Sequence, residues 1–255
     1  MYLTRQESRN IDRKAVEQFG ISGLVLMENA GRGAVDTLQR LEIVKPEIPV
    51  GLVCGKGNNG GDGFVMARHL KIRGLCPTVF LLADPKELTG DAGTNYNILR
   101  RCNVPIMERT FPVAGLERFG VLIDAMLGTG AAGIPREPFA KTIRSINTIR
   151  KESGVKVIAI DIPSGLDADT GLPSDPTVFA DYTLTFYASK VGFTKSEAAK
   201  YLGTVIVQDI GLNVHDNGLD VHDNGLDVHD NGLDVHDNGL DVHDNGLNIE
   251  RITDL

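Results

Sequence analysis

The chain has 255 residues, and 42% of them are hydrophobic, which suits one large soluble α/β domain with a sizeable core. No apolar run approaches the roughly 20 residues that span a bilayer. The formal net charge is −8, but residues 214–248 contain nine aspartates and no Glu, Lys or Arg, which leaves +1 for the rest. A nearly neutral body argues against a surface for long nucleic acids.

The first residues lack the apolar core of a signal peptide. We therefore expect a cytoplasmic protein, or one that reaches another compartment by a route that the sequence does not show. The three cysteines, Cys54, Cys76 and Cys102, are widely spaced and include no CxxC pair. This spacing argues against a zinc site or a disulfide framework, and we expect reduced, mostly buried thiols.

Two helices are predicted to open the chain. Thr4 and Glu7 fit a capping box, in which the hydroxyl and the carboxylate each bind an unpaired backbone N–H. An apolar stripe at helical spacing follows, and Gly20 is a typical helix stop. Apolar residues recur on one face over 22–41 and predict a second helix, in which Gly31 permits the close approach of another element.

From residue 49 onward, short apolar runs alternate with helical patterns. The predicted strands are Val50–Cys54, Thr78–Leu82, Pro105–Met107, Val121–Ala125, Val155–Ile160, Tyr182–Phe186 and Val205–Val207. The predicted helices cover 62–73, 89–102 and 137–152, with weaker signals at 113–118 and 195–200. Several strands are continuous Val, Ile and Leu runs, typical of strands buried on both faces. The alternation predicts a doubly wound α/β fold around a mainly parallel sheet, with its ligand beyond the carboxyl ends of the strands.

A glycine-rich run, Gly55–Gly63, separates the first of these strands from a helical pattern that begins at Phe64. Five glycines in nine residues are an entropic cost that an ordinary loop does not need. A strand, a glycine-rich turn and a helix together let backbone amides and the helix dipole bind phosphate. The run matches neither the Walker A pattern nor GxGxxG, so it predicts a nucleotide site without specifying a kinase or a dehydrogenase.

Two further strand ends carry polar residues and glycines at the same predicted edge. Asp161 directly follows the predicted strand Val155–Ile160. It fits a general acid/base, because burial raises the pKa of a carboxyl toward working pH. A helix N-cap or turn carboxylate is the structural alternative for Asp161 and for Asp124. Asp124, Asn59 and Ser164 together offer the oxygen ligands that suit a hard cation such as potassium.

Nucleophilic catalysis has little support. The chain lacks a Gly-x-Ser-x-Gly elbow, and the one histidine outside the repeat described next is His69. Lys190 follows another strand and could meet a phosphate as a point charge, but we expect a solvated surface lysine.

A seven-residue repeat, Val-His-Asp-Asn-Gly-Leu-Asp, occurs five times from Val214, with Asn248 in place of the last Asp. Each unit contains Asn-Gly, a turn signal that argues against a coiled coil. A short β-solenoid and a site for calcium or another metal are alternatives. We expect 213–255 to be a flexible acidic extension of a domain that covers 1–212.

A resemblance to a known family rests on four motifs in order: Leu26–Gly31, Gly57–Leu70, Asp124–Gly130 and Asp161–Gly171. They resemble the YjeF N-terminal domain, the NAD(P)HX epimerase family, from about residue 5 to residue 212. The resemblance implies a Rossmann-like three-layer α/β/α fold, often a homodimer. It implies epimerisation at C6 of the hydrated cofactors NADHX and NADPHX. Too few residues follow Leu212 for the dehydratase domain fused to many members, so we expect a separate ADP- or ATP-dependent dehydratase to act downstream.

The resemblance also assigns roles to residues. Asp161 would act as acid/base while the C6 hydroxyl leaves with help from the ring nitrogen and water returns to either face. A bound potassium ion would take Asn59, Asp124 and Ser164 as ligands. Substrate contacts would fall on Asn58, Asn59, Gly60, Gly61, Asp62, Gly128, Thr129, Gly130, Ala131, Ala132, Gly133, Ile134 and Asp161.

The main alternative is a non-catalytic nucleotide- or RNA-binding module of the same fold, since a fold does not guarantee an activity. Retention of Asn59, Asp124, Asp161 and the full glycine-rich run favours the enzyme, and the nearly neutral body disfavours an RNA platform. A third alternative is hydrolysis or transfer on another ADP-containing ligand, which the missing pair of base and nucleophile disfavours.

Overall fold

The computed structural model describes residues 1–109, 115–215, 218–220 and 249–250, with side chains for 1–109 and 115–212. Most of the repeat that begins at Val214, and with it the predicted flexible acidic extension, lies outside the described residues. Within the described part, no helix combines the length and the apolarity that crossing a membrane requires.

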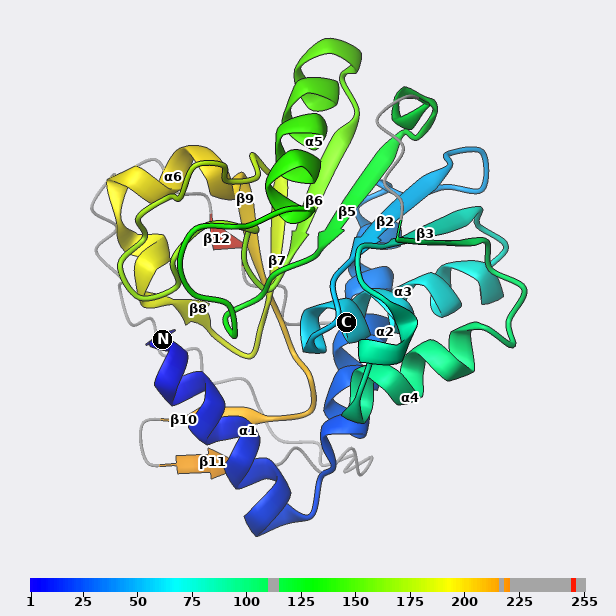
Figure 1. The fold of residues 1–255 in the computed structure, drawn as a ribbon. Coiled ribbons are helices and arrows are strands. Elements are labelled where there is room, and N and C mark those ends of the chain that lie inside the picture. The colour runs from blue at the N-terminus through cyan, green and yellow to red at the C-terminus, as the bar shows by residue number, and fades with distance from the viewer. Residues whose placement is uncertain (110–114, 216–217, 221–248, 251–255) are drawn as a thin grey trace, which may run out of the picture.

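A parallel sheet forms the centre of the molecule (Figure 1), with the strand order β12-β9-β7-β6-β5-β2-β3-β4. All neighbouring pairs are parallel. The strands are β2 (Val50–Cys54), β3 (Pro77–Leu81), β4 (Ile106–Glu108), β5 (Val121–Ala125), β6 (Lys156–Ile160), β7 (Tyr182–Phe186), β9 (Thr204–Gln208) and β12 (Ile249–Glu250). The chain builds outward from β2 to β4 and then returns beside β2 as β5. This reversal confirms the predicted doubly wound sheet and places its switch point between β2 and β5.

Helices cover both faces of the sheet. They are α1 (Arg5–Phe19), α2 (Gly23–Arg40), α3 (Asn58–Ile72), α4 (Gly90–Leu99), α5 (Phe139–Ser153) and α6 (Ser196–Leu202), with 3-10 turns η1 (Pro85–Glu87), η2 (Leu116–Arg118) and η3 (Val191–Thr194). Alternate strand residues point to opposite faces, so Leu52 packs in the core beneath α2 and α3, whereas Val53 packs beneath α5. The three layers are those of a Rossmann-like fold, as predicted.

Local signals placed several elements correctly. The limits of β2, β5 and β7 agree with the predicted strands, because each is a short, mostly buried segment rich in β-branched, aromatic or other apolar residues. The capping box of Thr4 and Glu7 begins α1, and Gly20 ends it in the left-handed conformation. Of the weak helical signal at 113–118, the described part contains only the 3-10 turn η2, and 110–114 lie outside the described residues.

The prediction that the glycine-rich run is mostly a turn is wrong from Asn58 onward, because α3 begins there. The glycines let this first part of the helix pack closely. A Cβ at Gly60 would collide with the carbonyl oxygen of Gly55, and one at Gly61 would lie 2.5 Å from Met27 Sδ on α2. Close packing therefore accounts for glycines that the sequence alone attributed to phosphate binding.

Two short pairs of strands were not predicted. Strand β1 (Tyr2–Leu3) pairs in parallel with β8 (Ser189–Lys190), so the start of the chain lies beside the segment after β7. Strands β10 (Asn213–His215) and β11 (Gly218–Asp220) form an antiparallel hairpin. Such short pairs form by tertiary contact and leave no run long enough to detect in the sequence.

The three cysteines are free thiols, as expected. The expectation that most of them are buried is wrong, because only Cys54, inside β2, is buried. Cys76 is exposed in the turn before β3, and Cys102 is partly exposed after α4.

Candidate active site

A cavity of about 540 Å³ opens at the carboxyl ends of β2, β5 and β6, at the switch point of the sheet. Its walls include Lys56–Asn59 at the start of α3, Met126–Ala131 after β5, and Asp161 after β6. Helix α1 runs below the carboxyl ends of the central strands in Figure 1 and adds Arg9 and Asp12 to the lining. The predicted location of the ligand site is thus the location of a real cavity.

Asp161 is held in place at both of its carboxylate oxygens. Its Oδ1 lies 3.0 Å from Nζ of Lys190, and its Oδ2 accepts a hydrogen bond of 3.0 Å from the backbone N–H of Thr129. The backbone of Asp161 has a φ of 65°, in the left-handed region that non-glycine residues seldom occupy. Backbone strain of this kind gathers at functional sites.

Two predictions about this part of the site are wrong. Burial acts to raise the pKa of Asp161, but the ammonium group of Lys190 and the N–H of Thr129 outweigh it, so this pKa lies below its usual value. Lys190 is 1% exposed, not a solvated surface lysine. Both errors have one cause, because the pairing of Lys190 with Asp161 depends on tertiary structure.

Asp62, which also lines the cavity, has an electrostatic environment opposite to that of Asp161. It lies on α3, is 9% exposed and lines the cavity. Burial raises its pKa well above the usual value, and the negative charges of Asp161 and Asp12 raise it further. The surroundings therefore move the pKa values of the two carboxyls in opposite directions, with that of Asp62 raised and that of Asp161 lowered.

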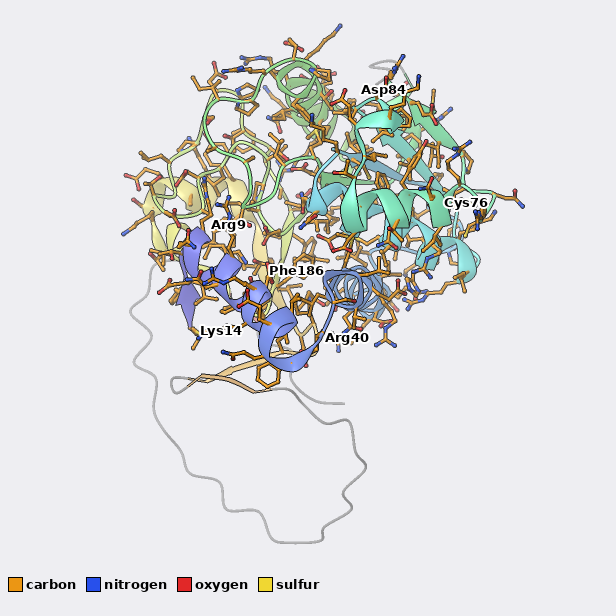
Figure 2. All side chains as sticks on the ribbon, turned by 60° about the horizontal axis from the view of Figure 1, so that its bottom comes forward. Arg9, Lys14, Arg40, Cys76, Asp84 and Phe186 are labelled. Atoms are coloured by element: carbon orange, nitrogen blue, oxygen red, sulfur yellow. The ribbon has the colours of Figure 1, made fainter. Side chains whose placement is uncertain are left out.

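Asp12, at the rim formed by α1, also has a raised pKa, of about 6. Desolvation at the site raises this pKa most. The charge of Asp161 raises it further, and the charge of Lys190 lowers it. Arg9, one turn earlier, stands on α1, and Phe186 lies between α1 and α2 (Figure 2); both line the cavity. The sequence shows no signal for Arg9 or Asp12, because polar residues on the outer face of an amphipathic helix look like ordinary surface.

Asp124 and Ser164 form a buried network just behind the cavity. Asp124 Oδ1 accepts from the Ser164 hydroxyl at 2.7 Å, and Oδ2 accepts from the Ser164 N–H at 2.8 Å. The Ser164 hydroxyl in turn accepts from the N–H of Leu127 at 3.0 Å. Burial raises the pKa of Asp124 to about 6, against the hydrogen bonds from Ser164 and from the N–H of Met126.

Asn59 provides a test of the predicted cation site. Both polar atoms of its side chain are buried, and neither has a hydrogen-bond partner among the described residues. A Cβ at Gly128 would lie 3.2 Å both from Asn59 Cβ and from Asp161 Oδ2, so these two side chains flank the same backbone position. An unpaired, buried amide oxygen suits a hard cation. The carboxylate placed beside Asn59 here is that of Asp161, not that of the predicted ligand Asp124.

The predicted substrate contacts divide into three groups. Asn58, Asn59, Asp62, Gly128–Ala131 and Asp161 line the cavity. Gly60 and Gly61 pack against the protein, as described above. Ala132, Gly133 and Ile134 lie outside the lining, and Ile134 is 70% exposed.

The residues that a serine hydrolase would need are far from a catalytic arrangement. The hydroxyl of Ser164 is engaged with Asp124 and is fully buried. His69 lies outside the cavity lining and contacts Glu28 on α2, with 2.7 Å between Nε2 and Oε1. These contacts agree with the low support that the sequence offered.

Comparisons with known proteins identify relatives. Residues 23–192 match the model of the family described as YjeF-related protein N-terminus. An NAD(P)H-hydrate epimerase of Rhodopirellula baltica is 41% identical over 212 residues, which cover 82% of this chain and 84% of that protein. A bifunctional NAD(P)H-hydrate repair enzyme, Nnr, of Archaeoglobus fulgidus is 42% identical over 213 residues, which cover 83% of this chain and 42% of that enzyme.

Among solved structures, the crystal structure of the yeast protein YNL200c superposes with a TM-score of 0.67 at 23% identity, covering 79% of this chain and 84% of that one. This likeness concerns the fold alone. The family match runs from the start of α2 into η3 and includes Asn59, Asp124 and Asp161. The chain therefore belongs to the YjeF N-terminal family.

Proposed function

We propose that this chain is an isomerase that interconverts the R and S epimers of the hydrated nicotinamide cofactors NADHX and NADPHX. The observation that carries the proposal is its 41% identity to an NAD(P)H-hydrate epimerase across most of both chains. The cavity supports it, because its lining contains one carboxyl with a lowered pKa and one with a raised pKa.

The chemistry requires the C6–O bond of the hydrated ring to break and to form again. The lone pair of the ring nitrogen moves into the bond to C6, and the hydroxyl leaves as water after it takes a proton. The ring then carries a positive charge and C6 is planar. Water can add to either face of C6, and loss of a proton from it completes the inversion.

Two residues divide this work. Asp161 is ionised, so it stabilises the positive ring and cannot protonate the leaving hydroxyl. Asp62 lines the same cavity and has a raised pKa, which suits it to donate the proton and to take it back from the incoming water. The role of acid that the sequence suggested for Asp161 passes to Asp62.

The start of α3 is the proposed site for the phosphates of the dinucleotide. Gly57 is the N-cap residue and makes no side-chain cap, so the first N–H groups of this 15-residue helix face the cavity mouth without a capping side chain. Thr129 and Gly130 lie across the cavity in the second glycine-containing loop. Arg9 adds positive charge at the rim.

We also propose a potassium ion held by Asn59, Asp124 and Ser164. The unpaired side chain of Asn59 and the buried carboxylate of Asp124 support this site. When bound, potassium would supply positive charge that offsets the dinucleotide phosphates and orders the loops. The homodimer, the cytoplasmic location and the separate downstream dehydratase are further proposals, and the bifunctional relative supports a linked second activity.

The function can be tested with a mixture of R- and S-NADHX and a dehydratase that consumes only S. The wild-type chain should drive the mixture to full consumption. A non-catalytic binding module would leave consumption halted at the initial S fraction, and that result would reject the isomerase. NADPHX, measured in parallel, would establish the cofactor preference.

A further inference from the structure

A buried ion pair lies directly behind the cavity. Lys190 is 1% exposed, and its Nζ is 3.0 Å from Asp161 Oδ1 and 3.3 Å from the carbonyl oxygen of Ala188. The same ammonium group lies 5.3 Å from the centre of the Tyr187 ring. Lys190 is absent from the cavity lining, but its two neighbours Asp161 and Tyr187 both line the cavity, and only Asp161 forms an ion pair with it.

Stability alone does not explain this pair. Transferring an ammonium group and a carboxylate from water to the interior is costly, and apolar replacements of buried pairs are often neutral or stabilising. The geometry suggests another purpose. With Oδ1 held by Lys190 and Oδ2 held by Thr129, the carboxylate has one orientation, and its side chain remains 14% exposed. A carboxylate fixed in this way needs no reorganisation when positive charge develops beside it.

The first residues of the chain complete this arrangement. Strand β1 pairs with β8 in a register that places Leu3 opposite Lys190, and Leu3 is itself buried. The N–H of Arg5 donates to Asp169 Oδ1 at 2.7 Å, and the Tyr187 hydroxyl donates to the carbonyl oxygen of Ser8 at 3.0 Å. The family match begins only at residue 23, so these contacts come from a segment outside it.

We propose that Lys190 is a positioning residue that keeps Asp161 ionised and directed into the cavity, and that β1 seals this pair from water. The inference rests on the proposed epimerase function and deepens it. Lys190 provides a permanent countercharge, and Asp161 provides the fixed negative charge that the ring meets when its hydroxyl leaves.

Three other titratable groups face Asp161: Asp12 from α1, Asp62 from α3 and Tyr187 after β7. None of them is a cation. Without Lys190, burial and the neighbouring carboxyls would raise the pKa of Asp161, and the site would lose its fixed anion over part of the working pH range.

The experiment compares the full chain with Lys190→Met, which keeps the length of the side chain and removes its charge. The kcat for conversion of R-NADHX should fall about 100-fold, with little change in KM, because the substrate contacts remain. The low-pH limit of kcat should move to higher pH. Lys190→Arg, which keeps the charge, should retain more activity than Lys190→Met, and the exposed Lys195→Met should behave as wild type.

Carbon NMR titration of the Asp161 carboxyl gives a readout that does not depend on activity. The pKa of Asp161 should rise in Lys190→Met and stay low in Lys195→Met. If Lys190→Met folds poorly, the double variant Lys190→Met, Asp161→Asn removes both charges. Its kcat should equal that of Asp161→Asn alone, since Lys190 acts only through Asp161.

An unchanged kcat in Lys190→Met, an unchanged pKa of Asp161, or a double variant clearly worse than Asp161→Asn would overturn the inference. Wild-type protein that fails to convert R-NADHX would instead reject the proposed function. In that case the NMR titration alone decides whether Lys190 controls Asp161.

Discussion

The two walls of the cavity place the same functional group in opposite environments. On one wall, Asp161 meets an ammonium group and a backbone N–H, and it is ionised. On the other, burial and the negative charges of Asp161 and Asp12 raise the pKa of Asp62. The residue type and its position at a strand end or helix start therefore do not determine whether a carboxyl serves as an acid or as a base. The nearest charge determines it, and for Asp161 that charge is Lys190.

The largest effect is expected from Asp161→Asn. The amide keeps the size of the side chain but removes the negative charge beside the reacting ring, so kcat for epimerisation should fall about 10³-fold, which corresponds to about 4 kcal/mol. Circular dichroism and the thermal midpoint check that the fold is intact. A folded variant with wild-type kcat would remove Asp161 from the mechanism.

Asp62→Asn tests the opposite wall. Loss of the proton donor should lower kcat about 100-fold. Asp62 must be protonated to act, so wild-type kcat should fall as pH rises above its raised pKa, and this limb should be missing from the pH profile of the variant. If Asp62→Asn keeps the high-pH limb, another group supplies the proton.

The packing of α3 against β2 can be tested by a matched pair of glycine substitutions. Gly60→Ala brings a methyl group into the backbone of Gly55, and it should lower the free energy of unfolding by about 1–3 kcal/mol. Gly57→Ala, three residues earlier, meets nothing within 4 Å and should cost less than about 1 kcal/mol. Urea unfolding measures both, and equal losses would show that close packing is not the reason for Gly60.

The smallest expected effect is the gain in stability that potassium gives the protein. If potassium occupies the site near Asn59, wild-type protein in KCl should be more stable than in tetramethylammonium chloride of equal ionic strength, by about 1 kcal/mol. Asn59→Ala should lose this difference, and Asn10→Ala, at a partly exposed position on α1, should retain it. A gain in KCl that survives in Asn59→Ala would place the ion elsewhere.

Much of the fold could be predicted from the sequence, because the signals for its helices and strands are local. Short segments rich in β-branched and apolar residues predict β2, β5 and β7, and the capping box of Thr4 and Glu7 predicts the start of α1. The strand ends likewise identified the edge of the sheet that carries Asn59 and Asp161. The start of α3 could not be predicted from the sequence, because the close contacts that require its glycines come from other elements.

The pKa shifts of the carboxyls in the site could not be predicted from the sequence for a related reason. Asp161 and Lys190 each follow a strand, but only folding brings their side chains to 3.0 Å. Arg9 and Asp12 look like ordinary polar residues of α1 until that helix is seen beside the cavity. Long-range pairing thus determines the properties that matter most for catalysis.

Direct titration of both carboxyls in the ligand-free wild-type protein by carbon NMR is the sharpest test, with Asp62→Asn and Asp161→Asn assigning the two signals. We predict that the pKa of Asp161 lies below 3.8, while the pKa of Asp62 lies well above 3.8. Two carboxyls that titrate together near 3.8 would contradict the division of roles between the two walls.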